Sequence, residues 1–341
     1  MAVPSARGHD WLSVLTILAV AAVSACSRPP GKLGFDPRAL SQGRGTAAPA
    51  WAVAPRPRAQ CTFSSAGENL FPAPAPDGQA VYFASSLGAH RFAIAKKPLG
   101  AGAVAFLTSG ASSDLHPAIS PDGRRLAFTS DREGGFSLYL IDERAASEPR
   151  RLTSKGADAF GPSWAPDSRR IVYFRGGASA EFELWVLDAE SGEDRRLGPG
   201  LFPSWSPPLP DGEWIAYQSA RGGGDSWFSI WKVRPDGSRP TRLVLNDAWG
   251  AVHPTWSPDG RWIAFAAVGK SPEARETSPG APERADDIYA VTAEGTQLTN
   301  LTGERAGIAE WNPAFGPNGR LHFNSDEGGA VNIWSIEPGL P

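Results

Sequence analysis

The apolar positions of this chain gather in short runs that recur at a nearly even interval. Each run holds three apolar or aromatic residues and follows directly on a turn signal. Runs this short, bounded by turn residues and rich in β-branched and aromatic side chains, are typical of strands rather than helices. Six such runs occur, at residues 81–83, 126–128, 171–173, 215–217, 263–265 and 321–323.

The turn before each run has the form Pro-Asp-Gly or a close variant. Proline presets φ for the bend, Asp accepts backbone N–H groups, and Gly adopts the positive φ that closes it. Successive turns are 45, 45, 44, 48 and 59 residues apart at their Asp or Asn. A further Pro-Asp-Gly at 235–237 breaks this spacing and lacks the preceding aromatic strand, so we assign it to a different hairpin. The six periodic turns are residues 76–78, 121–123, 166–168, 210–212, 258–260 and 317–319.

Three more strands complete each repeat. A short strand precedes the turn, a third strand such as FSLYLID or FELWVLD follows a Gly-rich loop, and a weaker fourth strand is visible in PRRLTS at 149–154. Four antiparallel strands in about 45 residues make one blade of a β-propeller. The sequence therefore predicts an all-β fold, a propeller of six four-stranded blades.

The last blade lacks its fourth strand, because little chain follows the third strand at 331–336. A strand with an open edge would leave backbone groups unpaired. The segment RAQCTFSSAGENLFP at 58–72 aligns with RRLTSKGADAFGP at 150–162 and can supply the missing strand. We expect residues 58–64 to close the ring, with Cys61 as a small buried hydrophobe in the position of Leu107 and Leu152.

The repeat x-P-x-W-S-P-D-G-x-x-I-A-F, followed by Y/W-x-V/I-D and R-x-L-T, resembles the TolB-type (WD-like, PDG-repeat) propellers of bacterial envelope proteins. The resemblance covers residues 58–336 and rests on turn and core positions. It therefore implies a fold and an envelope location more strongly than an activity. The same repeat occurs in prolyl-oligopeptidase-like peptidases and in oligogalacturonate-lyase-like enzymes.

The N-terminus has the pattern of a secreted lipoprotein. A mostly apolar stretch at 11–25 is too short to span a bilayer comfortably and ends in Val-Ser-Ala before Cys26. This ending resembles a lipobox, which predicts a signal peptide over 1–25 and a lipid on Cys26; an ordinary cleavage site beside an uninvolved cysteine is the alternative. Residues 26–57 are rich in Pro, Gly and Ala and read as a flexible tether before a propeller at 58–341.

Composition and the absence of known motifs disfavour several classes of function. The net charge of −3 and the lack of a basic block disfavour nucleic-acid binding. The closest match to a hydrolase nucleophile elbow, at 161–165, lies inside a predicted blade, and no P-loop, HExxH or paired-cysteine motif occurs. We therefore expect no cofactor.

The candidate binding residues lie at the channel mouth. His116 and His253 occupy equivalent positions in opposite blades, too far apart for both to ligate one metal easily. Asn312 holds the same repeat position in the last blade. Around the mouth, Glu68, Asn69, Asp114, Asp158 and Glu310 form a predicted acidic rim, which either attracts a cation, a basic peptide or an amine, or caps strand ends. An insertion at 268–287 lengthens the fifth blade on the same face. Long loops of this kind often carry binding specificity.

These observations favour a non-catalytic propeller, anchored by lipid in the bacterial envelope and facing the periplasm from the outer membrane. It would bind a protein or peptide at the channel mouth. The alternative is a glycan-active lyase or hydrolase that uses the same mouth.

Overall fold

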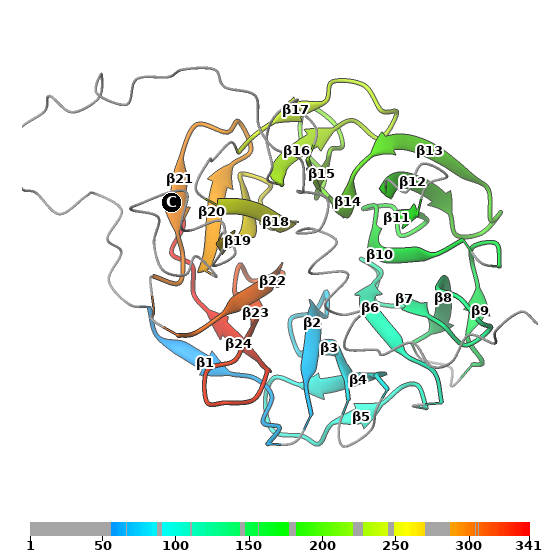
Figure 1. The fold of residues 1–341 in the computed structure, drawn as a ribbon, viewed down its shortest axis with the longest axis horizontal. Coiled ribbons are helices and arrows are strands. Elements are labelled where there is room, and N and C mark those ends of the chain that lie inside the picture. The colour runs from blue at the N-terminus through cyan, green and yellow to red at the C-terminus, as the bar shows by residue number, and fades with distance from the viewer. Residues whose placement is uncertain are drawn as a thin grey trace, which may run out of the picture.

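The computed structural model describes residues 56–65, 67–86, 91–109, 111–143, 147–155, 157–176, 182–220, 228–244, 249–269, 287–303, 305 and 307–341. All regular elements in this part of the chain are strands. They form six separate four-stranded antiparallel sheets arranged as a ring, which confirms the predicted six-bladed propeller (Figure 1). No helix among the described residues is long and apolar enough to cross a membrane.

The blades follow one another along the chain, each running from its innermost to its outermost strand. Blade 1 contains β2 (Asn69–Pro74), β3 (Ala80–Ser85), β4 (Ala93–Pro98) and β5 (Ala105–Phe106). Blade 2 contains β6 (Asp114–Ile119), β7 (Arg125–Ser130), β8 (Ser137–Asp142) and β9 (Arg150–Arg151). Blade 3 contains β10 (Ala159–Trp164), β11 (Arg170–Gly176), β12 (Phe182–Asp188) and β13 (Asp194–Pro199).

Blade 4 contains β14 (Leu201–Trp205), β15 (Ile215–Ser219), β16 (Ser229–Val233) and β17 (Thr241–Arg242). Blade 5 contains β18 (Trp249–Trp256), β19 (Trp262–Gly269), β20 (Asp287–Thr292) and β21 (Leu298–Asn300). Blade 6 contains β22 (Glu310–Phe315), β23 (Leu321–Ser325), β24 (Asn332–Ile336) and, as its outermost strand, β1 (Arg58–Gln60). The extra Pro-Asp-Gly at 235–237 joins β16 to β17, as expected.

The periodic turns connect the first and second strands of each blade. In blade 2, the Gly123 N–H donates to the Ser120 carbonyl at 2.8 Å, and Gly123 has a φ of +69°. The Asp122 carboxylate accepts the Arg124 N–H at 3.1 Å. Gly and Asp therefore have the roles that the sequence predicted for them.

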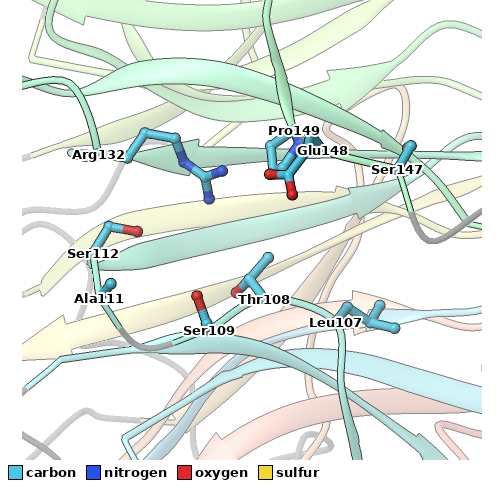
Figure 2. A pocket seen from close by; sticks show the side chains of 9 residues that line it. All are labelled: Leu107, Thr108, Ser109, Ala111, Ser112, Arg132, Ser147, Glu148 and Pro149. Carbon is cyan, nitrogen blue, oxygen red and sulfur yellow. The ribbon is translucent and has the colours of Figure 1, made fainter.

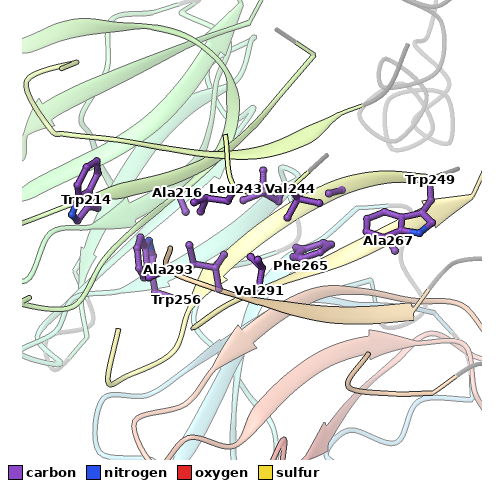
Figure 3. Close-up of a cluster of buried hydrophobic side chains, with 13 residues drawn as sticks. Trp214, Ala216, Leu243, Val244, Trp249, Trp256, Phe265, Ala267, Val291 and Ala293 are labelled. Carbon is purple, nitrogen blue, oxygen red and sulfur yellow. The ribbon is translucent and has the colours of Figure 1, made fainter. Parts of the chain in front are cut away.

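Apolar and aromatic side chains fill the space between neighbouring blades. Figure 3 shows the cluster between blades 4 and 5, where Trp214, Trp256 and Phe265 are buried. Two of the three tryptophans that precede the turns also join blades by hydrogen bonds. Trp256 Nε1 donates to the Ser204 carbonyl of blade 4 at 3.1 Å, and Trp164 Nε1 to the Ala118 carbonyl of blade 2 at 2.9 Å. Trp205 Nε1, at the same repeat position, has no partner among the described residues.

The ring closes through the N-terminal strand. β1 pairs antiparallel with β24, and the Cys61 N–H donates to the Ile333 carbonyl at 2.7 Å. Leu107 and Leu152 donate to equivalent carbonyls in blades 1 and 2, which confirms that Cys61 takes their position. The Cys61 side chain is buried, and burial raises the pKa of its thiol.

The residue after Cys61 repeats the pattern too. The Thr62 hydroxyl accepts the Ile333 N–H at 2.9 Å, as the Thr108 and Thr153 hydroxyls accept the N–H groups of their own third strands. In the Leu-Thr pair of the repeat, the leucine thus supplies an apolar side chain to the core, and the threonine hydroxyl accepts a backbone N–H of the third strand. Cys-Thr reproduces it in the closing strand.

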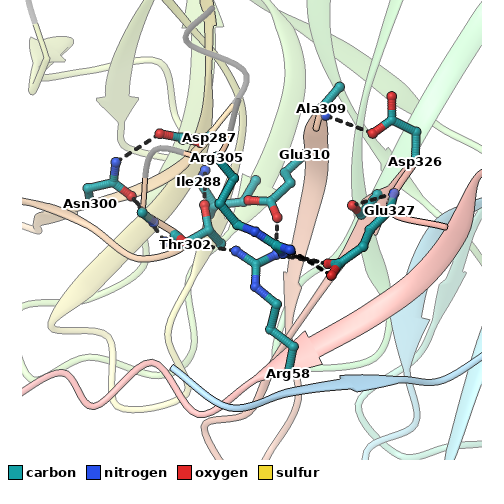
Figure 4. A network of polar contacts seen from close by, with 12 residues as sticks. Arg58, Asp287, Ile288, Asn300, Thr302, Arg305, Ala309, Glu310, Asp326 and Glu327 are labelled. Atoms are coloured by element: carbon teal, nitrogen blue, oxygen red, sulfur yellow. Dashed lines mark hydrogen bonds and ion pairs between the residues drawn. The ribbon is translucent and has the colours of Figure 1, made fainter. Parts of the chain in front are cut away.

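A network of charged side chains secures this closure between blades 5 and 6 (Figure 4). Arg58 from β1 forms an ion pair with the buried carboxylate of Glu310, and its Nη2 donates to the Thr302 carbonyl at 2.7 Å. Arg305 makes two hydrogen bonds to Glu327, of 2.6 and 2.8 Å. We call this group, Arg58, Thr302, Arg305, Glu310 and Glu327, the clasp network.

Candidate functional site

The innermost strands of the six blades, β2, β6, β10, β14, β18 and β22, face the centre of the ring (Figure 1). We call the cavity between them the channel. Each strand contributes one residue followed by a proline, at the same position of every blade. Together they line a cavity of about 130 Å³. The twelve residues are Phe71, Pro72, His116, Pro117, Gly161, Pro162, Phe202, Pro203, His253, Pro254, Asn312 and Pro313.

The residue before each proline has an unusual backbone conformation. All six have positive φ, between 44° for Phe202 and 57° for Phe71 and Gly161, and each sits at a β-bulge where the pairing with the second strand shifts. Non-glycine residues rarely adopt this conformation, because it crowds the Cβ. Bulges re-aim side chains. Here the repeated bulge directs one residue per blade to the channel, and in every blade except the third, which has Gly161, that residue carries a side chain.

The two histidines lie against aromatic rings in this channel. The His116 ring centroid is 4.1 Å from that of Phe71 and 5.9 Å from that of Phe202. The His253 ring meets Phe202 edge-on at 4.2 Å. Phe202 thus contacts both histidines, so the sequence prediction that they share the channel mouth is matched by their placement.

Both imidazoles are held neutral. Burial lowers the pKa of His116 to about 3, with a smaller contribution from the neighbouring His253, and lowers the pKa of His253 to about 4. Both ring nitrogens of His116 and the Nδ1 of His253 are buried without a hydrogen-bond partner among the described residues. Buried polar groups are usually satisfied. These nitrogens are therefore available to a ligand.

Two of the predicted rim residues do not face the solvent. Asp114 is fully buried, where Arg132 Nη2 donates to its two carboxylate oxygens at 3.1 and 3.2 Å. Glu310 is buried in the clasp network, and burial raises its pKa against the opposing effect of Arg58. The expectation of an open acidic rim needs correction at these two positions, because each carboxylate is buried and paired with an arginine, Asp114 within blade 2 and Glu310 through the closing strand.

The other predicted residues are divided between channel and surface. Asn312 lines the channel, and its Nδ2 donates to Asn324 Oδ1 at 3.0 Å. Glu68 and Asp158 are exposed. The structure thus brings His116, His253 and Asn312 together and separates them from the acidic residues. Cys26 and most of the 268–287 insertion lie outside the described residues.

The aromatic members of the site, Phe71 and Phe202, are not among the residues that the sequence singled out. Their signal was present, because each precedes a proline at the same repeat position as the histidines. Ser-Asp pairs at 130–131 and 325–326 follow the second strands of blades 2 and 6. Their aspartates bind the preceding connections, since Asp131 accepts the Ser113 N–H and Asp326 accepts the Ala309 N–H, each at 2.8 Å. Among the described residues, no group of three His, Cys, Asp or Glu side chains could hold a metal ion.

Comparison with known proteins agrees with the propeller fold. Residues 55–208 match the family model described as the TolB beta propeller domain. This match covers less than half of the chain, and by it the chain is similar to TolB-type propellers. An uncharacterised protein of Agrobacterium fabrum is 36% identical over 87 residues, a match that spans 25% of this chain and 28% of that relative.

Solved structures show how widely the TolB-type propeller fold is shared. A TolB-like protein of Agrobacterium tumefaciens is similar with a TM-score of 0.59 and 22% identity, over 79% of this chain and 90% of that one. TolB of Acinetobacter baumannii is similar with a TM-score of 0.54 and 18% identity, over 79% and 63%. An oligogalacturonate lyase of Vibrio parahaemolyticus is similar with a TM-score of 0.55 and 16% identity, over 82% and 92%. At these identities the likeness concerns the fold.

Proposed function

We propose that this TolB-type propeller is a non-catalytic binding protein of the bacterial envelope that takes a protein or peptide partner at its channel mouth. The observation that carries the proposal is the channel wall itself. Aromatic rings, six prolines and two neutral histidines line this cavity, and three of the buried imidazole nitrogens have no hydrogen-bond partner in the described part of the chain. Apolar walls with a few oriented polar groups are the usual makeup of a binding site.

The size and chemistry of the cavity favour an inserted side chain or chain end over a large ligand. About 130 Å³ accommodates a small group. Phe71 and Phe202 would pack against its apolar part, and His116 would donate or accept one hydrogen bond. Neutral imidazoles do both.

The envelope location rests on the N-terminal sequence and on the TolB resemblance. Lipidation of Cys26 would tie the propeller to a membrane, in our proposal the outer membrane, with the propeller in the periplasm. We expect Cys26→Ser to move the protein from the membrane fraction to the soluble fraction. A serine variant that stays in the membrane, with the mass of the wild type, would contradict the lipid anchor.

Partner capture tests the binding role. The wild type, with its native N-terminus, is cross-linked in cells and recovered from detergent-solubilised membranes, beside His116→Ala/His253→Ala and Phe71→Ala variants. We expect capture of the partner to fall about tenfold in the channel variants, since each removes contacts at the centre of the site. Asp236→Ala, in the exposed β16–β17 turn, is the matched control and should capture normally. Undiminished capture by both channel variants, with unchanged melting curves, would exclude the channel.

The two histidines also support a second candidate, a glycan-active lyase or hydrolase. Neutral imidazoles with free nitrogens can accept a proton, and the fold is shared with an oligogalacturonate lyase. Incubation with oligogalacturonate, followed by the ultraviolet absorbance of unsaturated products, distinguishes the two. Absorbance that grows with the wild type and not with His116→Ala would favour the enzyme, and a flat trace favours the binding protein.

A further inference from the structure

The cleft between blades 1 and 2 contains a larger cavity than the channel, of about 420 Å³ (Figure 2). Volumes of this order hold small-molecule ligands in other proteins. The lining is mostly polar and comes from the end of blade 1 and from two loops of blade 2. The nine residues are Leu107, Thr108, Ser109, Ala111, Ser112, Arg132, Ser147, Glu148 and Pro149.

The propeller repeat shows which position of the ring this cavity occupies. Cys61 and Leu152 donate to equivalent carbonyls, so three residues earlier Arg58 of blade 6 corresponds to Pro149 of blade 2. By the same repeat, Thr302 corresponds to Thr108. The cleft between blades 1 and 2 is therefore the counterpart of the one that contains the clasp network.

The two clefts differ in what fills them. Between blades 5 and 6, the side chains of Arg58 and Arg305 occupy the space (Figure 4). Between blades 1 and 2, Pro149 is too short to replace Arg58. The connection from Thr108 to Asp114 is also two residues shorter than that from Thr302 to Glu310, and it brings no arginine. The cavity is thus the space that two long side chains fill at the closure.

Arg132 provides a fixed cationic group in this cavity. It follows its second strand at the position that Glu327 holds in blade 6. Its Nη2 donates to Asp114, its Nε donates to Ser130 Oγ at 3.0 Å, and its guanidinium lies 4.8 Å from the centre of the Tyr139 ring. Nη1 makes no hydrogen bond to a described residue, and Figure 2 shows the guanidinium pointing into the cavity.

A carboxylate stands near this guanidinium across the cavity. Glu148 is exposed at the rim and directs its oxygens toward the space beside Arg132 (Figure 2). Hydroxyl groups of Ser109 and Ser112 border the same space. The cavity thus offers a donor and an acceptor of opposite charge, with small polar groups around them.

We propose that this cavity binds a small zwitterion of the amino-acid class. Its carboxylate accepts hydrogen bonds from Arg132 Nη1, and its ammonium group donates to Glu148. The first contact reproduces the Arg305–Glu327 pair of the clasp network with the charges reversed, because Arg132 replaces Glu327 and the ligand carboxylate replaces the Arg305 guanidinium. Charge-assisted pairs of this kind are the strongest polar contacts in such a site.

Calorimetric titration of the purified propeller with glycine, glutamate, acetate and ethylamine tests the proposal. We expect saturable binding of the two amino acids, with acetate and ethylamine each at least about tenfold weaker because each has only one of the two charges. Glu148→Gln should weaken glycine binding and leave acetate binding unchanged. Absence of saturable binding by any amino acid, or equal binding of glycine and acetate, would overturn the proposal.

Pro149→Arg is the decisive variant, since it restores the side chain that fills the equivalent cleft at the closure. We expect it to abolish amino-acid binding. Ala111→Trp fills the cavity from the other side and serves if Pro149→Arg does not fold. His116→Ala is the control: it leaves binding here unchanged, which separates this site from the channel. Glycine binding retained by both filled variants would refute the assignment.

Discussion

The clasp network and the channel wall both bury polar side chains, and they treat them in opposite ways. In the clasp network, Arg58 pairs with the buried Glu310 and Arg305 pairs with the partly exposed Glu327, so that each charge has a partner, although Glu310 Oε2 makes no hydrogen bond among the described residues. In the channel, His116 is buried and both of its ring nitrogens lack a partner among the described residues. A buried group without a partner costs stability. The comparison indicates that the clasp network stabilises the closed ring and that the channel wall is suited to bind a ligand group.

The largest effect should come from breaking the clasp network. Arg58→Ala leaves the Glu310 carboxylate buried without its cation, which costs about 3–5 kcal/mol of unfolding free energy. Urea unfolding followed by tryptophan fluorescence measures this loss. Glu310→Gln in the Arg58→Ala background is the control and should recover part of it, because the unpaired charge is gone. A loss below about 1 kcal/mol for Arg58→Ala, the range of exposed ion pairs, would contradict a closing role.

Acidification should act on the histidines. The folded pKa of His116 is lowered to about 3 and that of His322, also buried, to about 4, whereas unfolded histidine titrates near 6.5. Below pH 6.5 the unfolded state binds more protons, so stability falls as the pH drops, until the folded groups also protonate near pH 3–4. From pH 7 to pH 5 each buried histidine should contribute a loss of about 2 kcal/mol.

The contribution of His116 to this loss can be isolated by measuring the unfolding free energies of the wild type and of His116→Phe between pH 7 and pH 5. The difference between the two proteins should change by about 2 kcal/mol between pH 7 and pH 5. If the unfolding free energies of the two proteins change equally with pH, His116 protonates alike in the folded and unfolded states, which would contradict a neutral His116 in the folded channel.

At neutral pH, His116→Phe should raise stability by about 1 kcal/mol, because it removes two unsatisfied nitrogens and keeps a ring beside Phe71 and Phe202. The melting temperature checks this, and partner capture should fall in the same variant. His253→Phe offers a parallel case. If His116→Phe lowers the melting temperature and still captures the partner, His116 contributes to stability and not to binding, which would contradict the contrast between the clasp network and the channel.

The smallest effects should come from the exposed acidic residues. Glu68→Ala and Asp158→Ala should each change the unfolding free energy by no more than about 0.5 kcal/mol, since neither side chain is buried. Asp114→Ala, made beside them, should cost several times more, because it leaves Arg132 without its buried partner. Equal melting temperatures for all three variants would show that the buried Asp114 contributes no more to stability than the exposed Glu68 and Asp158.

The sequence predicted the fold well because the information for each blade is local. A turn like that at 121–123 and an apolar strand after it recur in every repeat, a Leu-Thr pair recurs in three of them, and Cys61 was placed by the same alignment. The histidines were found because they occupy a repeat position before proline. The burial of Asp114 and Glu310 could not be predicted, because it depends on which arginine the folded chain places beside each carboxylate: Arg132 is 18 residues from Asp114 within blade 2, whereas Arg58 is 252 residues from Glu310. Only the closed ring brings Arg58 and Glu310 together.

The closing strand also sets an order of events for folding. Ala59 and Ser335 are neighbours in the finished sheet but are 276 residues apart in the chain, so β1 is synthesised long before β24 exists. Contacts over such separations form slowly, because a large loop must close first. Until then β1 and blade 6 each present an open edge, and a second chain can offer the matching strand. Slow or crowded folding should therefore produce exchanged dimers, in which the first strand of one molecule completes the last blade of another.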